Sequence, residues 1–234
     1  MKKLGLVGGV GPASTLEYYK SINDAYFKRL ENPPKSGANP PMVIDSLNLA
    51  DAYDLASKKD WKNFAELFID SIHRLHRAGA EFGAISANTA HIVFDDIQAA
   101  SPIPLLGIVD EVCKYAKSRN YKKIIVFGTA FTMSSGMYEG KCRQYGLEAF
   151  VPNEADKEAI QNIIFPHLQG GIVLEDEKAV ILEIADKLLT EHQADALLLG
   201  CTELPLIIQE GDLDAPLIDT TQIHIDSILR EILA

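Results

Sequence analysis

The sequence has few cysteines and no long apolar run. Its 234 residues include three cysteines, which are too few for a disulfide framework. These cysteines show no CxxC spacing, and no paired histidines accompany them, so we expect no metal site. No apolar run approaches the roughly 20 residues that span a bilayer, and glycines soon after Met1 argue against a signal peptide. These features predict a cytoplasmic protein that does not bind membranes.

Basic residues are also scarce. The chain carries 22 Lys and Arg against 33 Asp and Glu, which gives a formal net charge of −11. An acidic chain of this kind is a poor nucleic-acid binder, because phosphate binding requires a basic surface. Apolar residues make up 47%, as in ordinary globular proteins. The length allows one large domain or two small ones, and either can bury a core.

Short apolar runs alternate along the chain with longer amphipathic segments. This alternation predicts an α/β fold built from βα units around parallel sheets. The runs predict strands at residues 4–7, 42–47, 82–85, 105–109, 123–127, 194–199 and 217–218. The clearest amphipathic patterns predict helices at residues 12–30 and 61–78, and from a cap at 219–221 to about 233.

The second half of the chain repeats the pattern of the first. Three pairs of equivalent positions recur in order, with offsets of 120, 114 and 112 residues: Gly8 and Gly128, Ala87 and Cys201, Pro104 and Pro216. Nearly constant offsets predict an internal duplication of a small α/β domain. We therefore expect a first domain of residues 1–107 plus 215–234 and a second domain of residues 108–214.

Polar clusters follow four of the predicted strands. They are Gly8–Gly11, Ala87–His91, Gly128–Thr132 and Gly200–Glu203. Ligands of open parallel sheets bind outside the carboxyl ends of the strands. Asn and Thr side chains with free backbone N–H groups suit a small carboxylate. The GxGxxG order of a dinucleotide-binding turn is absent, so a nucleotide is not favoured.

Cys201 is the one conspicuous candidate for a nucleophile or base. It follows a predicted strand in a strand–turn–helix setting, where a helix N-terminus would lower the pKa of a thiol. The alternative is a buried, inert cysteine. We expect Cys113 to lie in the core and Cys142 to be incidental on a helix. His91 is expected to be a packed or capping histidine, and the role of His224 stays open.

Several motifs together resemble the aspartate/glutamate racemase family. They are Gly8-Gly9, Ser14-Thr15, Tyr18-Tyr19, Asn88-Thr89-Ala90-His91, Gly128-Thr129 with Thr132, Gly200-Cys201-Thr202-Glu203, and Asp219-Thr220-Thr221 with His224. The resemblance covers nearly the whole chain. It implies a cofactor-independent racemase of a small acidic amino acid, commonly a homodimer. It also implies two pseudo-symmetric α/β domains, with the active site in the cleft between them and a cysteine on each side.

The sequence departs from the family at one decisive position. Ala87 directly precedes Asn88-Thr89, where the family has its first cysteine, and the internal repeat independently pairs Ala87 with Cys201. Inverting a stereocentre requires an acid and a base on opposite faces, and alanine can transfer no proton. Ser86 is adjacent, but its side chain would point to the other side of the strand. The chain is then a deliberate Cys→Ala variant, an impaired homologue with one-sided chemistry or none, or an enzyme of a one-thiol reaction.

The resemblance also implies which residues form the site. Cys201 would be the surviving acid/base, and the substrate-binding residues would be Asn88, Thr89, Ala90, Thr129, Thr132, Thr202 and Glu203. Lys157 is a candidate for binding the side-chain carboxylate, with a solvated helix start as the alternative. Aspartate and glutamate are not distinguished. Two other functions stay open: one-thiol decarboxylation of a substituted malonate, and non-catalytic binding of an acidic amino acid.

Overall fold

The computed structural model describes residues 1–32, 34–35, 37–165 and 167–234. The chain divides into two compact units. The first unit contains Met1–Ile108 and His224–Ala234, and the second contains Val109–Ile223. The chain therefore leaves the first unit after residue 108 and returns to it at residue 224.

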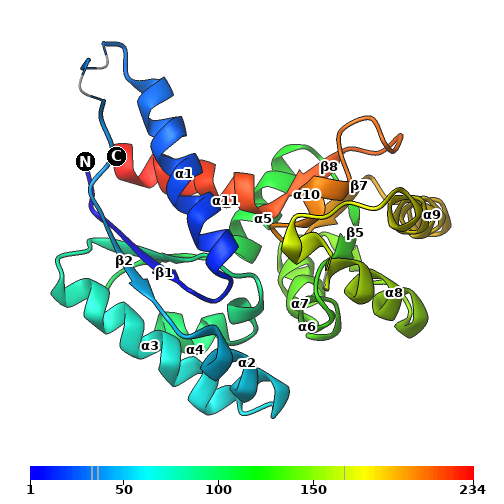
Figure 1. The fold of residues 1–234 in the computed structure, drawn as a ribbon, viewed down its shortest axis with the longest axis horizontal. Coiled ribbons are helices and arrows are strands. Elements are labelled where there is room, and N and C mark those ends of the chain that lie inside the picture. Colours follow the sequence, from blue (N-terminus) through cyan, green and yellow to red (C-terminus); the bar gives the residue numbers. More distant parts are fainter. Residues whose placement is uncertain (33, 36, 166) are drawn as a thin grey trace. The chain divides into compact units, whose positions relative to one another are not determined.

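The first unit is built on a four-stranded parallel sheet of order β2-β1-β3-β4. Its strands are β1 (Leu4–Gly8), β2 (Met42–Ser46), β3 (Phe82–Ile85) and β4 (Leu105–Leu106). Its helices are α1 (Pro12–Arg29), α2 (Leu49–Ser57), α3 (Trp61–Arg77), the 3₁₀ helix η1 (Thr89–Val93), α4 (Phe94–Ala100) and most of α11 (Thr220–Leu233). Helices α1 and α11 cover one face of this sheet, and α3 and α4 cover the other (Figure 1).

Two glycines allow α3 to pack closely on this sheet. A Cβ atom on Gly5 would lie 2.8 Å from the Cβ of Ala80 and 3.1 Å from that of Leu75. A Cβ on Gly83 would lie 3.3 Å from Cδ1 of Ile72. The absence of side chains at these positions therefore lets the apolar face of α3 lie directly against β1 and β3.

The second unit has a matching four-stranded parallel sheet of order β6-β5-β7-β8. Its strands are β5 (Lys123–Phe127), β6 (Glu148–Phe150), β7 (Ala196–Leu199) and β8 (Leu217–Asp219). Its helices are α5 (Ile108–Ser118), α6 (Ala130–Ser134), α7 (Met137–Gln144), α8 (Glu154–Ile164), η2 (Leu168–Gly170), α9 (Glu175–His192) and α10 (Leu204–Ile207).

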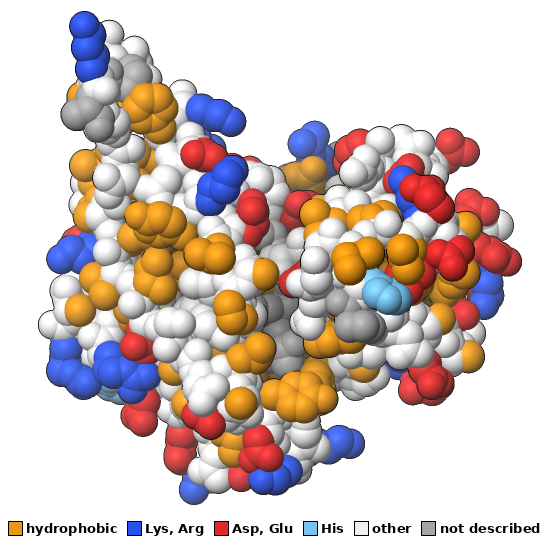
Figure 2. Space-filling model, viewed as in Figure 1, with side chains coloured by type: hydrophobic (Ala, Val, Ile, Leu, Met, Phe, Trp, Pro, Cys, Tyr) orange, Lys and Arg blue, Asp and Glu red, His pale blue; other side chains and the backbone are white. Residues whose placement is uncertain are grey.

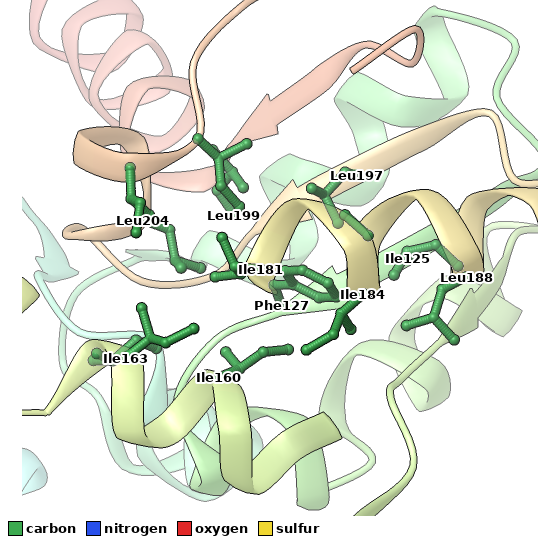
Figure 3. Packing of buried hydrophobic residues seen from close by; sticks show 14 of the residues in the cluster. Ile125, Phe127, Ile160, Ile163, Ile181, Ile184, Leu188, Leu197, Leu199 and Leu204 are labelled. Carbon is green, nitrogen blue, oxygen red and sulfur yellow. The ribbon is translucent and has the colours of Figure 1, made fainter. Parts of the chain in front are cut away.

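The core of the second unit lies between its sheet and helices α8 and α9. Phe127 projects from β5 into a cluster that includes Ile160 of α8 and Ile184 of α9 (Figure 3). The opposite face of β5 is buried as well, since Ile124 and Val126 have no exposed surface. Burial on both faces explains why this strand reads as a continuous apolar run.

The two sheets share strand order and register. In the first sheet Leu4 pairs with Phe82, and in the second sheet Ile124 pairs with Ala196. Likewise, Gly83 pairs with Leu105 in the first sheet, and Leu197 pairs with Leu217 in the second. These pairs repeat the offsets of 120, 114 and 112 residues found in the sequence. The predicted α/β fold with two related parallel sheets is therefore confirmed.

Two differences from the sequence prediction concern the end of β4 and the boundary between the units. The strand predicted at 105–109 ends at Leu106, because Gly107 packs against the ring of Phe94 and α5 begins at Ile108. Residues 215–223 were expected in the first domain. They contain β8, which pairs with β7, so this segment belongs to the second unit.

Charged side chains of both signs are interspersed over the visible face of the molecule (Figure 2). Within the described residues, no helix combines the length and the apolar character needed to cross a membrane.

Candidate active-site residues

A rigid turn follows β1 in the first unit. The backbone N–H of Gly9 donates to Oγ1 of Thr15 over 2.8 Å, and the Thr15 hydroxyl donates to the carbonyl of Gly11 over 3.0 Å. Gly9 has a φ of +83°, and a Cβ there would lie 2.1 Å from the carbonyl oxygen of Leu47. Only glycine fits this position, so the turn between β1 and α1 has a fixed conformation.

Ser86 follows β3 and points into the interior of the first unit. Its hydroxyl donates to the carbonyl of Val7 over 3.1 Å. Its own carbonyl accepts a hydrogen bond from the Ser14 hydroxyl over 2.6 Å. The prediction that Ser86 does not replace the missing cysteine is consistent with this geometry. Ala87 comes next and is partly exposed at the strand end.

His91 fixes the backbone of Ala87. Its Nε2 accepts a hydrogen bond from the N–H of Ile108 over 2.9 Å, so its proton lies on Nδ1. That Nδ1–H donates to the carbonyl of Ala87 over 3.0 Å. Burial, followed by the charge of nearby His224, lowers the pKa of His91 to about 3. His91 is therefore a neutral packed histidine, as the sequence predicted, and it is not free to act as a base.

His224 completes the same buried network. Its Nε2–H donates to the carbonyl of Leu106, and its Nδ1 accepts from the hydroxyl of Tyr18, both over 2.9 Å. Burial lowers the pKa of His224 to about 4. The two neutral imidazoles together hold the chain on either side of Gly107, where β4 ends.

The end of β5 in the second unit is fixed by threonines. Oγ1 of Thr129 caps α6 by accepting from the N–H of Thr132 over 3.4 Å. Thr132 is buried, and its methyl group packs over Gly128, where a Cβ would lie 2.9 Å away. The N–H of Ala130 donates to Oε1 of Gln161 over 2.7 Å. These contacts hold the turn after β5 in one conformation.

Cys201 lies two residues beyond the end of β7 and bonds to a carboxylate. Its thiol donates to Oε2 of Glu203 over 2.8 Å. The Thr202 hydroxyl donates to the same oxygen, also over 2.8 Å. Burial of the sulfur, the charge of Glu203 and this hydrogen bond raise the pKa of the thiol well above its usual value.

The expected lowering of the Cys201 pKa is therefore wrong. The helix that follows, α10, has only four residues, so its dipole is small. The Glu203 carboxylate lies against the thiol and opposes a second negative charge there. In the resting protein Cys201 is a protonated thiol, which suits it to donate a proton.

The remaining predicted site residues lie at the same strand ends. Asn88 and Thr89 are partly exposed after β3, whereas Ala90 is fully buried and offers no exposed side chain. Lys157 lies in the first turn of α8, and its Nζ bonds to Oε1 of Glu154 over 2.8 Å. The Lys157 side chain is only 12% exposed, so it is not fully solvated, and its role in binding the side-chain carboxylate stays a prediction.

Two features of the second unit were not expected. Cys142 is not incidental, because it is fully buried with its sulfur 3.5 Å from that of Cys113. The contact of Gln161 with the turn after β5 carried no signal in the sequence, since the partner lies 31 residues away. Within the described ranges, no three His, Cys, Asp or Glu side chains are grouped so that they could hold a metal ion.

The fold and the strand-end residues define a class: α/β proteins of two like parallel-sheet units, with polar turns and a cysteine at the strand ends. Residues 7–228 match the Asp/Glu/Hydantoin racemase family, and the chain belongs to this family.

Similar proteins carry racemase names. The broad specificity amino-acid racemase RacX of Bacillus subtilis is 26% identical over 93% of this chain and 92% of its own length. A crystal structure of a Yersinia pestis protein, provisionally assigned as an Asp/Glu racemase, has a TM-score of 0.91 and 33% identity over all of both chains. An aspartate racemase homologue from Pyrococcus horikoshii OT3 has a TM-score of 0.87 and 33% identity, again over both whole chains.

Proposed function

We propose that the protein transfers protons at the α-carbon of an amino acid without a cofactor, with Cys201 as its acid/base. Membership of the racemase family over residues 7–228 carries this proposal. The position of Cys201 at the end of β7, with its thiol proton held by Glu203, supports the assignment of the acid/base. Alanine at position 87 leaves no second thiol at the equivalent strand end of the first unit. We therefore expect proton exchange on one face of the substrate, with racemisation absent or strongly impaired.

The proposed substrate is a small acidic amino acid held by polar groups at the strand ends. Asn88, Thr89 and Thr202 are partly exposed there, and Thr129 lies at the neighbouring strand end. Their hydroxyl and amide groups can bind the α-carboxylate and amino group. The homodimer and the cytoplasmic location stay predictions from the resemblance and the composition.

The test is α-proton exchange in deuterated water, followed by proton NMR. L- and D-aspartate and L- and D-glutamate are incubated separately, and chirality is determined at the end. We expect one enantiomer to exchange its α-proton without inversion, because Cys201 removes and returns a proton on one face. Since RacX is named for broad specificity, the panel should include neutral and basic amino acids.

The matched control is Cys201→Ala, which should abolish the exchange. Cys142→Ala removes a thiol that lies in the core and should leave exchange in place. No exchange with any amino acid would contradict the proposal. Saturable binding that survives Cys201→Ala would then identify a binding protein.

A second candidate is one-thiol decarboxylation of a substituted malonate. The favouring observation is that Cys201 is a protonated thiol, and this reaction needs one proton delivered to one face of a carbanion. Carbon dioxide release from an arylmalonate or alkylmalonate, lost in Cys201→Ala, would establish this reaction in place of amino-acid exchange.

A further inference from the structure

The Cys201–Glu203 pair has no counterpart in the first unit. In the internal repeat of the sequence, Ala87 is equivalent to Cys201 and Thr89 is equivalent to Glu203. Thiol and carboxylate thus occur together at the end of β7, and both are missing at the end of β3. The two polar groups are joined directly, since the thiol donates to Oε2 of Glu203 over 2.8 Å.

Thr202 binds the same carboxylate oxygen that accepts the hydrogen bond of the thiol. Its hydroxyl donates to Oε2 over 2.8 Å, so this oxygen accepts two hydrogen bonds from adjacent residues. Two donors on one oxygen hold the carboxylate against the sulfur and leave Oε1 for other contacts. The arrangement places an acid, the thiol, and a base, the carboxylate, within hydrogen-bond distance, so that one proton can pass between them.

A thiol cannot remove a proton until it has lost its own. An ionised thiol beside an ionised carboxylate would place two negative charges in contact in a partly buried site, which is unfavourable. The cost is avoided when the thiol proton passes to the carboxylate, because the pair then keeps a single negative charge.

We propose that Glu203 is the proton partner of Cys201, taking the thiol proton when Cys201 acts as a base and returning it afterwards. The S–H bond breaks with its electron pair left on sulfur, and an O–H bond forms at Oε2. The thiolate then takes the α-proton, so an S–H bond forms while the C–H electron pair stays on the substrate carbon. Both steps reverse without any further reactant. The base step rests on the proposed function, whereas the proton sharing itself does not.

The first experiment measures proton sharing without substrate. Alkylation of Cys201 by iodoacetamide is followed by mass spectrometry across a pH series in the unmodified protein and in Glu203→Gln. We expect Glu203→Gln to lower the midpoint pH of alkylation by roughly one to three units, since it removes the adjacent negative charge. The control Glu210→Gln removes the same charge at an exposed position and should leave the profile unchanged. Buried Cys113 and Cys142 report unfolding if they react.

The second experiment measures α-proton exchange of the same variants. Glu203→Gln should lower the exchange rate by roughly 10²- to 10⁴-fold although its thiolate is more abundant, and Glu210→Gln should not. An unchanged alkylation profile or an undiminished exchange rate in Glu203→Gln would overturn the proposal. Should this variant not fold, an alkylation midpoint in the unmodified protein at or below that of free cysteine would overturn it as well. A shifted profile without exchange by the unmodified protein would support proton sharing and refute the proposed function.

Discussion

Ala87 stands where the proposed function would need a second proton-transferring side chain. His91 holds its carbonyl, and Ser86 is turned into the core, so the backbone at position 87 is fixed while its side chain carries no proton. The equivalent position of the second unit holds Cys201. Under the proposed function, position 87 is therefore a fixed backbone site that lacks a proton-transferring group.

Introducing a thiol at position 87 should allow inversion. We expect Ala87→Cys to convert one-sided exchange into racemisation, with a gain of roughly 10²-fold or more in inversion rate, because a general acid then serves the second face. Chiral chromatography of the product measures it. Ala87→Ser is the matched control, since a hydroxyl is far less acidic than a thiol, and it should still give exchange without inversion. Continued exchange without inversion in Ala87→Cys would show that position 87 is not the second acid/base.

Single residues of the site differ in how far the sequence could predict them. The positions of Ala87 and Cys201 follow from the repeat and from the polar residues that end both strands, with Gly200 marking the end only before Cys201. The tautomers of His91 and His224 could not be predicted, because each depends on a bond to a residue far away in the chain, such as Tyr18. The raised pKa of Cys201 depends on a turn that brings residues i and i+2 together, and no periodic pattern encodes that turn.

At the scale of elements, the two buried histidines connect segments that are distant in sequence. His91 in η1 binds the first residue of α5, and His224 in α11 binds α1 and the end of β4. Each imidazole uses one nitrogen as donor and the other as acceptor, so protonation would break a bond in both cases. The packing of these elements therefore requires the neutral form.

Stability should consequently fall in mild acid. The folded pKa values of about 3 for His91 and about 4 for His224 lie below the unfolded value near 6.5, so the unfolded chain binds more protons between these limits. The stabilisation is complete above pH 6.5 and is lost as the pH falls through this window. Between pH 7 and pH 5 we expect a loss of about 2 kcal/mol per histidine in the free energy of unfolding.

Urea denaturation at pH 7 and pH 5 measures this loss. His224→Gln should remove about half of the difference between the two pH values, whatever its effect on stability at pH 7. His76→Gln, at an exposed position of α3, should keep the full difference. An equal pH dependence in His224→Gln would show that this histidine is not held neutral.

Elements were predicted best where both faces are buried. Strands β3 and β5 have the predicted bounds, because a buried parallel strand is a continuous apolar run. The edge strand β6 escaped prediction, since its three residues include exposed Glu148 and show no apolar run. Strand β4 was predicted too long because the apolar pattern continues without a break from Leu105 into α5.

At the scale of the whole molecule, the first unit is discontinuous in sequence. It needs the last eleven residues, His224–Ala234, although the chain has passed through the entire second unit before them. Helix α11 is held there by buried apolar side chains and by a hydrogen bond of 3.0 Å from the N–H of Lys2 to the carbonyl of Ile232. Completion of the first unit therefore depends on the far end of the chain.

Truncation of one buried side chain of α11 should weaken the first unit selectively. Leu229 is 0% exposed, so we expect Leu229→Ala to cost about 2–5 kcal/mol in the free energy of unfolding. Leu233→Ala is the matched control, since Leu233 is 42% exposed and should cost less than about 0.5 kcal/mol. Trp61, the single tryptophan, lies in the first unit and reports its unfolding by fluorescence.

Amide hydrogen exchange in β5 and β7 measures the stability of the second unit in the same variants. Their amide protons should lose less protection than those of β1 and β3 in Leu229→Ala. Equal loss in both sheets would show that the two units unfold as one cooperative body.

The pairing of Lys2 with Ile232 and Glu231 brings the two ends of the chain side by side (Figure 1). A short peptide linker could therefore join them, and new ends could be opened between Ile108 and Val109. In such a circular permutant residues 109–223 would come first, and residues 224–234 would run directly into 1–108. Each unit would then be one continuous stretch of sequence, and the chain would pass from the second unit to the first only once. Either unit could therefore be expressed alone. A fold that now needs its last residues to complete its first unit would become two separable, sequentially translated domains.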